Sequence, residues 1–319
     1  MTFAATPKRD LTRTEIQQFH DDGVILVRDA LEPNWLELIE DGIEKARADL
    51  SMIGKFMSKG TDGYEMDVFL WKRIDALRDA IYYGPFAHWA QQLMGSKEVR
   101  FFYDQMFVKE PGTNAPTPWH QDLSFWPIRG EQICSMWITV DEVSRESSGL
   151  MYVKGSHRWP QRFKAISPDY FEPIIDEKMD DIPDINADPD AYDLVDWDMQ
   201  PGDILMFHPL TLHGSYGNSH RDRRRRAIAF RWTGDDVVYA PSPTRMGINF
   251  RHESVAGGPL RGAAFPRIIP THIPEERAVR LRPETPAKKE VLRGIAKSFL
   301  AKLSPKTTVE KSKLKQTWN

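Results

Sequence analysis

Cysteine is nearly absent from this sequence of 319 residues, and long apolar runs are missing altogether. The single cysteine, Cys134, excludes an intrachain disulfide and fits a reducing compartment, and we expect it to be an unreactive core residue on a strand. No stretch approaches the roughly 20 apolar residues that cross a bilayer, and residues 1–10 lack the apolar part of a secretory signal. We therefore predict a cytoplasmic protein without a transmembrane segment.

Charge of neither sign dominates the chain, whose formal net charge is −3. Residues 271–319 nevertheless hold 12 Lys or Arg against 5 Asp or Glu, a local +7 that leaves −10 on the remainder. An acidic body argues against nucleic acid as the main partner. We divide the chain into a domain of residues 1–270 and a basic C-terminal tail of residues 271–319. The tail predicts an amphipathic helix from about residue 286, which could contact a partner or an anionic surface.

Helical patterns come first along the chain. Residues 11–19 predict a helix with Thr12 as its N-cap and Glu15 three residues later. A buried strand is expected at residues 24–27, a second helix at 29–49, opening near Pro33, and a further helical stretch at 75–94.

Strand-like patterns follow from residue 99 and are separated by Gly, Pro and Ser turns. Short strands after N-terminal helices predict a mainly β fold, a sandwich or barrel with a helical jacket. The expected strands are residues 100–109, 133–140, 150–153, 203–207 and 226–232.

Residues 160–199 interrupt this strand pattern. Between residues 169 and 198 there are 12 acidic residues and one Lys, without the alternation of a strand. We predict a lid-like insertion here, which is either a solvated loop or a cover over the barrel mouth, because loops of this length are often functional.

Two histidines and an aspartate stand in a pattern typical of a metal site. His120 and Asp122 are two positions apart, so on an extended strand their side chains point to the same face. A second strand, residues 203–207, leads to His213. Two histidines and one carboxylate form the facial triad that leaves open positions on Fe(II).

His208 competes with His213 for the place of the third ligand. We assign His213, because residues 214–215 (Gly-Ser) follow it and a strand-like run with Arg225 begins 12 residues later. An arginine at such a place can hold a carboxylate through two parallel hydrogen bonds.

Several segments stand in a fixed order along the chain: residues 118–123 (PWHQDL), 148–157 (SGLMYVKGSH), 201–203 (PGD), and 213–215 (HGS) with 225–228 (RRAI). Together with the N-terminal helix and strand they resemble the phytanoyl-CoA dioxygenase family over about residues 11–235. The resemblance implies a double-stranded β-helix (jelly-roll, cupin-like) fold with iron at its mouth.

The family's site residues carry over to this chain. Its iron ligands match His120, Asp122 and His213. Its arginine for the distal carboxylate of 2-oxoglutarate matches Arg225, with Arg224 as a rival, and strand alternation favours Arg225 because residues 227 and 229 would share its inward face. Further contacts with the co-substrate fall at Ser215, Trp137, Met106 and Gln121.

The resemblance implies an Fe(II)- and 2-oxoglutarate-dependent dioxygenase, an oxidoreductase that uses O₂ as its second co-substrate. Related iron halogenases carry a small residue in place of the carboxylate, so Asp122 argues against halogenation. We predict hydroxylation of an unactivated C–H bond in a small-molecule metabolite. Two alternatives are a non-catalytic jelly-roll module for binding or sensing, and an oxygenase of macromolecules that uses the basic tail for docking.

Overall fold

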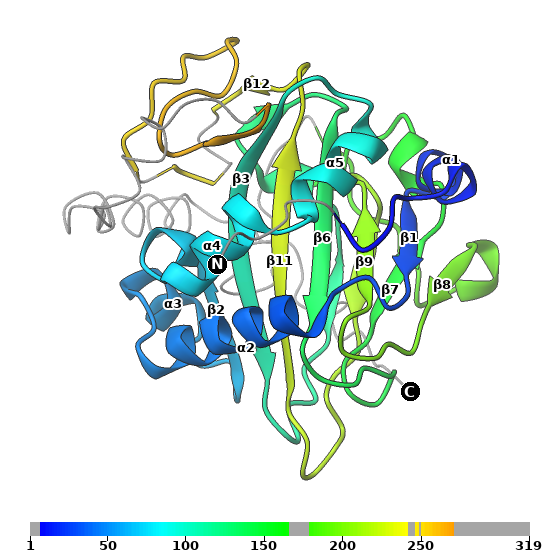
Figure 1. Cartoon of the computed structure of the whole chain (residues 1–319). Coiled ribbons are helices and arrows are strands. Elements are labelled where there is room, and N and C mark those ends of the chain that lie inside the picture. The colour runs from blue at the N-terminus through cyan, green and yellow to red at the C-terminus, as the bar shows by residue number, and fades with distance from the viewer. Residues whose placement is uncertain (1–6, 166–178, 242–245, 249, 271–319) are drawn as a thin grey trace, which may run out of the picture.

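The structure, a computed structural model, describes residues 7–165, 179–241, 246–248 and 250–270. Two β-sheets form the body of the molecule, and helices cover one face of the larger sheet (Figure 1). The helices are α1 (Arg13–Asp22), α2 (Pro33–Ala48), α3 (Met52–Met57), α4 (Asp75–Tyr83), α5 (Phe86–Met94) and α6 (Asp122–Phe125), with single turns η1 (Leu70–Lys72), η2 (Ser156–Arg158) and η3 (Pro189–Ala191). The strands are β1 (Val24–Val27), β2 (Tyr64–Val68), β3 (Val99–Lys109), β4 (Thr117–His120), β5 (Ile128–Arg129), β6 (Ile133–Thr139), β7 (Leu150–Val153), β8 (Leu194–Asp196), β9 (Ile204–Phe207), β10 (His213–Ser215), β11 (Arg225–Thr233), β12 (Val238–Tyr239) and β13 (Arg267–Ile269).

The first helix forms as its capping residues predict. Thr12 Oγ1 accepts a hydrogen bond from the Glu15 amide, while the Glu15 carboxylate accepts one from the Thr12 amide. The helix ends at Gly23, whose φ of +80° lies in the left-handed region that glycine adopts without strain. Strand β1 follows directly, at the predicted residues.

The helical stretch predicted over residues 75–94 is two helices rather than one. α4 ends at Tyr83 and α5 begins at Phe86. Pro85 separates them because it has no amide hydrogen to continue the helical hydrogen bonds. The sequence also gives no prediction of α3 and β2. Asp67 of β2 is fully buried and forms an ion pair with Arg73 at 2.8 Å.

The two sheets have the topology of a jelly roll. The larger sheet has the order β1-β9-β6-β11-β3-β13, with β2 also paired to β3, and the smaller has the order β4-β10-β7-β8. Neighbouring strands in both sheets are antiparallel. In Figure 1, α2 and α5 lie across the larger sheet in front of β3, β11 and β6. The predicted mainly β fold with a helical jacket is confirmed.

Strand β11 separates two parts of the core. Ile228 and Phe230 pack among the helices that cover the larger sheet, while Ala227 and Ala229 face the interior between the sheets. Since successive side chains of a strand alternate between its faces, Arg225 shares the inward face with the two alanines. The predicted alternation is therefore confirmed.

The described part of residues 160–199 forms an outer layer on the smaller sheet. Ile185 is fully buried against Trp119, Met151 and Leu212, and β8 pairs with β7. The expectation of a stretch without strands is therefore wrong. A strand of three residues is held by pairing with β7 rather than by an alternating pattern of its own, and the lid remains a prediction.

Cys134 is fully buried in β6, as expected of a core residue, and burial raises the pKa of its thiol. Within the described residues, no helix has both the length and the apolar character required to cross a membrane. The predicted basic tail lies outside the described residues, and the domain boundary at residue 270 stays a prediction.

Candidate active site

His120 and His213 face each other across two neighbouring strands. His120 is the last residue of β4 and His213 the first of β10, and the two are register partners with ring centroids 4.1 Å apart. A Cβ atom at Gly214 would lie 2.9 Å from the Thr117 carbonyl oxygen of β4. Glycine therefore permits the close approach of β4 and β10 that brings the two imidazoles together.

Asp122 reaches the same point from a different element than the sequence predicts. β4 ends at His120, Gln121 remains extended (φ −113°, ψ 126°), and Asp122 opens the one-turn helix α6. The expected shared strand is therefore wrong, but one extended residue between His120 and Asp122 is enough to keep their side chains on one side. His120 Nε2 lies 3.7 Å from Asp122 Oδ1, and potential ligand atoms of His120, Asp122 and His213 lie within 4.8 Å of one another.

Backbone carbonyls set the tautomer of both imidazoles. His120 Nδ1 lies 2.8 Å from the Pro118 carbonyl oxygen, and His213 Nδ1 lies 2.9 Å from that of Thr211. A carbonyl only accepts, so each Nδ1 donates and each Nε2 keeps its lone pair. The buried Asp122 Oδ2 has no hydrogen-bond partner among the described residues. Two imidazole lone pairs and a free carboxylate oxygen are the donor set of a divalent transition metal.

The protonation states of His213 and Asp122 suit a cation. Burial, together with the neighbouring His120, lowers the pKa of His213 to about 3. Burial acts to raise the pKa of Asp122, but the Arg231 charge and the two histidines outweigh it, and the pKa of that carboxyl is lowered. Near neutral pH the structure thus offers a neutral imidazole at His213 and a carboxylate at Asp122, the forms that bind metal.

His208, the rival of His213, lies outside this cluster. Its Nε2 is 3.1 Å from the Glu131 carbonyl oxygen, and its Nδ1 accepts a hydrogen bond from the Leu210 amide. Both ring nitrogens are therefore engaged by backbone, and the ring lies 5.5 Å from that of His157.

Arg225 and Arg224 point in opposite directions. The Arg224 side chain is 45% exposed and pairs with Glu110, whereas Arg225 is 1% exposed. Arg225 donates to the Phe107 carbonyl oxygen and to Ser148 Oγ, and its guanidinium carbon lies 5.4 Å from the centre of the Trp137 ring. Within the described residues it has no carboxylate partner, so its charge can receive one from a ligand.

A second buried cation, which the sequence analysis misses, lies beside Arg225. Lys109 is fully buried and donates to Ser215 Oγ and to the carbonyl oxygens of Ala115 and Tyr216. Burial and the Arg225 charge lower the pKa of Lys109 well below its usual range. Its position on β3 is the signal in the sequence, because Lys109 has the same strand parity as the inward-facing Phe107.

The structure places the other predicted contact residues differently. Ser215 and Trp137 lie beside Arg225 and Lys109, as described above. Met106 is fully buried among residues under the helices. It lies on the face of β3 opposite Phe107, so a contact with a co-substrate from this position is not supported. Gln121 donates to the Leu210 carbonyl oxygen, which turns its amide away from His120 and Asp122.

Arg231 is a further residue that the sequence analysis misses. It is 2% exposed, and its Nη2 lies 3.7 Å from Asp122 Oδ2. The alternation that selects Arg225 would have found it, because positions 225, 227, 229 and 231 share one face of β11.

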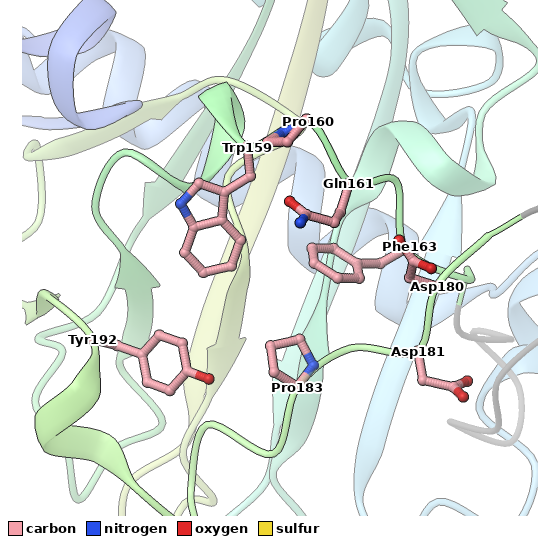
Figure 2. Close-up of a pocket in the computed structure, with 8 residues that line it drawn as sticks. All are labelled: Trp159, Pro160, Gln161, Phe163, Asp180, Asp181, Pro183 and Tyr192. Atoms are coloured by element: carbon pink, nitrogen blue, oxygen red, sulfur yellow. The ribbon is translucent and has the colours of Figure 1, made fainter.

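A separate pocket of about 550 Å³ lies on the 160–199 segment and does not include the triad. Figure 2 shows Trp159 and Tyr192 on one side of it and Phe163 and Pro183 on the other. Gln161, Pro160, Asp180 and Asp181 complete the lining.

These features define a jelly-roll protein with a candidate metal centre of two histidines and one carboxylate, and with the buried basic residues Arg225 and Lys109 on the same inward side. The family profile of phytanoyl-CoA dioxygenase (PhyH) matches residues 19–227. The chain belongs to the phytanoyl-CoA dioxygenase family, as the sequence resemblance predicts.

The family relatives differ in how much of this chain they match. Peroxisomal phytanoyl-CoA dioxygenase of Rattus norvegicus is 31% identical over 145 residues, which cover 44% of this chain and 41% of the rat protein. The Homo sapiens enzyme is 24% identical over 232 residues, which cover 70% and 63% of the two chains. This chain thus spans less than two thirds of the length of these relatives.

Solved structures share the fold at lower identity. The carbocyclase SnoK of nogalamycin biosynthesis is 21% identical with a TM-score of 0.66, and the match covers 82% of this chain and 98% of SnoK. The epimerase SnoN, in complex with Fe³⁺, alpha-ketoglutarate and nogalamycin RO, is 19% identical with a TM-score of 0.64, over 80% and 97% of the two chains.

Proposed function

We propose that this protein is an Fe(II)- and 2-oxoglutarate-dependent dioxygenase that hydroxylates an unactivated C–H bond of a small-molecule metabolite. The observation that carries the proposal is the cluster of His120, Asp122 and His213, whose potential ligand atoms lie within 4.8 Å of one another while each imidazole is held by its Nδ1–carbonyl contact. We assign His120, Asp122 and His213 as the iron ligands.

The buried basic residues near Ser215 support 2-oxoglutarate as the co-substrate. Ser215 lies two residues beyond His213 on β10, and side chains at this spacing on a strand lie roughly 7 Å apart on one face. That spacing matches a five-carbon dicarboxylate with one end at the metal and the other at Ser215. Arg225, which lies beside Ser215 through Ser148, would neutralise the distal carboxylate, and Lys109, which donates to Ser215, would add a second positive charge only when it is protonated.

The chain's own residues would bind, orient and shield the reactants. With iron and 2-oxoglutarate bound, the site supplies an oxidant for C–H bonds. The carbonyls of Pro118 and Thr211 would hold each neutral ring in the tautomer whose Nε2 has a lone pair for the metal. Trp137 and Phe107 cover Arg225 and keep water from its contact with the carboxylate, which strengthens that contact.

A small-molecule substrate is supported by the neighbour SnoN, which was crystallised with nogalamycin RO. A cytoplasmic location rests on the single buried cysteine and is tested by imaging the tagged protein.

A role of the basic tail in the reaction is tested by deleting residues 286–319. Unchanged turnover of a free small molecule would remove the tail from the mechanism.

The activity is tested with purified protein, Fe(II), ascorbate and 2-oxoglutarate. We expect O₂-dependent formation of succinate, slow without substrate and faster with the right metabolite, which then gains the mass of one oxygen. His120→Ala is the control. Succinate no higher than in that variant would refute the activity, and metal binding without a 2-oxoglutarate-dependent absorption band would favour a binding module.

A further inference from the structure

We propose that Arg231 binds an oxyanion of the substrate, a carboxylate or a phosphonate, beside the metal centre. This inference rests on the proposed function and names the chemical class of its substrate. Arg231 comes from the inward face of β11, six residues beyond Arg225, and lies next to Asp122.

The guanidinium of Arg231 is buried with most of its donors unused. Within the part of the chain that the structure describes, its one side-chain hydrogen bond runs from Nη2 to Gln105 Oε1, at 2.9 Å. Nε and Nη1 are buried and have no hydrogen-bond partner among the described residues. Leaving buried charged donors unpaired is costly, so these two N–H groups identify a place for a ligand acceptor.

Aromatic rings fix the orientation of this guanidinium. Its central carbon lies 4.3 Å from the centre of the Tyr103 ring and 5.3 Å from that of Trp126. Rings that contact the guanidinium by cation–π interaction hold it in place and leave its planar N–H edge for an acceptor. Nη2 carries a second N–H, and this group together with either Nε or Nη1 forms the fork that binds two oxygens of one oxyanion.

Asp122 is not the hydrogen-bond acceptor for the free N–H groups of Arg231. The nearest approach of the pair is 3.7 Å, from Arg231 Nη2 to Asp122 Oδ2, which is longer than a hydrogen bond. The same carboxylate is also assigned to the metal.

The formal charges of the loaded site favour an anionic substrate. A divalent metal, Asp122, Arg225 and the dianion of 2-oxoglutarate together carry no net charge. The charge of Arg231 then stays without a counterion, and a charged Lys109 would only add to the excess. A substrate oxyanion on Arg231 would balance that charge, and it would place the rest of the substrate against the metal.

The test uses the full-length protein with Mn(II) in place of iron and with saturating 2-oxoglutarate, which occupies Arg225. The probes are 6,6,6-trifluorohexanoate, 6,6,6-trifluorohexylphosphonate and the neutral 6,6,6-trifluorohexanamide. ¹⁹F relaxation by Mn(II) reports binding near the metal without turnover. We expect at least one anion to bind about tenfold or more tightly than the amide, and the two anionic arms identify which oxyanion is preferred.

Three variants connect this preference to Arg231. Arg231→Met should abolish it, Arg231→Lys should keep part of it because the charge remains without the fork, and the exposed Arg224→Gln should leave it unchanged. Since Arg231→Met also removes the 3.7 Å ion pair with Asp122, a circular-dichroism spectrum and an Mn(II) affinity like those of the wild type are needed to show that the variant keeps its fold and its metal centre.

Two results would overturn the inference. One is wild-type protein that binds Mn(II) and 2-oxoglutarate but shows no preference for the anions. The other is an Arg231→Met variant that keeps the preference and loses affinity for Mn(II) instead, which would make Arg231 a positioning residue for Asp122. In both cases the dioxygenase assignment survives, whereas failure to bind Mn(II) and 2-oxoglutarate at all would remove it as well.

Discussion

The interior has a metal end, with the triad and Arg231, and a closed end, with Lys109, Ser215 and Arg225. The two ends share strands β10 and β11 but differ in how their polar atoms are paired. At the metal end, Asp122 Oδ2 and the Nε and Nη1 atoms of Arg231 have no hydrogen-bond partners among the described residues. At the closed end, Lys109 Nζ lies within hydrogen-bond distance of three oxygens and Arg225 donates to two, so that Arg225 Nε is the one guanidinium nitrogen of that residue without a partner among the described residues.

This difference indicates that the two ends have different functions: the closed end receives the co-substrate carboxylate, and the metal end binds the metal and the substrate. Partners of Lys109 and Arg225 are neutral carbonyl and hydroxyl oxygens, so the closed end is held in shape before a carboxylate arrives, which reduces the cost of ordering it on binding. At the metal end, the charged donor atoms of Arg231 and the acceptor atom Asp122 Oδ2 stay available for a metal or a ligand. The two ends should therefore be separable by mutation.

Removing a metal ligand should have the largest effect. We expect His213→Ala to lose Fe(II) affinity by more than about 100-fold, because even residues that only orient a ligand are worth about 10- to 100-fold, and to form no succinate. Metal binding is measured by calorimetry. His208→Asn is the matched control, since His208 is also a buried histidine but is engaged by backbone. Equal losses in both variants would contradict the assignment of His213.

Arg225→Met should affect the closed end alone. We expect 2-oxoglutarate affinity to fall about 30-fold or more, equivalent to about 2 kcal/mol for a buried charge pair, with Fe(II) affinity unchanged. The 2-oxoglutarate affinity is measured by titrating the 2-oxoglutarate-dependent absorption band under anaerobic conditions. Arg224→Met, at the exposed neighbour, should bind 2-oxoglutarate as the wild type does. A comparable loss in Arg224→Met would reverse the choice between the two arginines.

Gly214→Ala should weaken both ends together and more mildly. The added Cβ would meet the Thr117 carbonyl oxygen at 2.9 Å, so β4 and β10 must separate by a few tenths of an ångström. Since a misplacement of about 1 Å can cost about 100-fold in rate, we expect roughly tenfold slower succinate formation. Steady-state kinetics and circular dichroism test this. A folded variant with wild-type turnover would show that Gly214 does not set the histidine spacing.

The sequence predicts the site better than it predicts the elements around it. The triad and Arg225 follow from residue types and from strand alternation, both of which are local properties. The same rule, continued from position 225 to 231, finds Arg231. Lys109 is harder to find, because a lysine near a strand end usually lies in solvent, and its burial depends on oxygens that distant segments supply.

The missed elements depend on tertiary contacts. β8 lies in an acidic stretch and exists through its pairing with β7. β2 contains the buried Asp67, which Arg73 and Ser51 stabilise from other elements. Met106 is buried in the core under the helices. A shift of one residue along a strand exchanges its two faces, and hydrophobic character alone does not tell which core a methionine enters.

The two ends should also respond to acid in different pH ranges, each with a modest effect. In the metal-free protein the folded-state pKa of His213 is lowered to about 3, below its usual 6.5. Its contribution to stability is therefore full above pH 6.5 and is lost as the pH falls from 6.5 toward 3. The pKa of Lys109 is also lowered, from 10.5, so its contribution is full above pH 10.5 and is already declining as the pH falls below that value.

Each group should change the free energy of unfolding by up to about 1.4 kcal/mol per pH unit within its range. Chemical denaturation of metal-free protein measures this against pH, for the wild type, His213→Gln and Lys109→Met. We expect Lys109→Met to diverge from the wild type as the pH rises from 7 to 10.5, and His213→Gln to diverge between pH 6.5 and 4. Parallel curves for Lys109→Met would mean that Lys109 keeps its proton in the fold, so the closed end would hold two full charges instead of one.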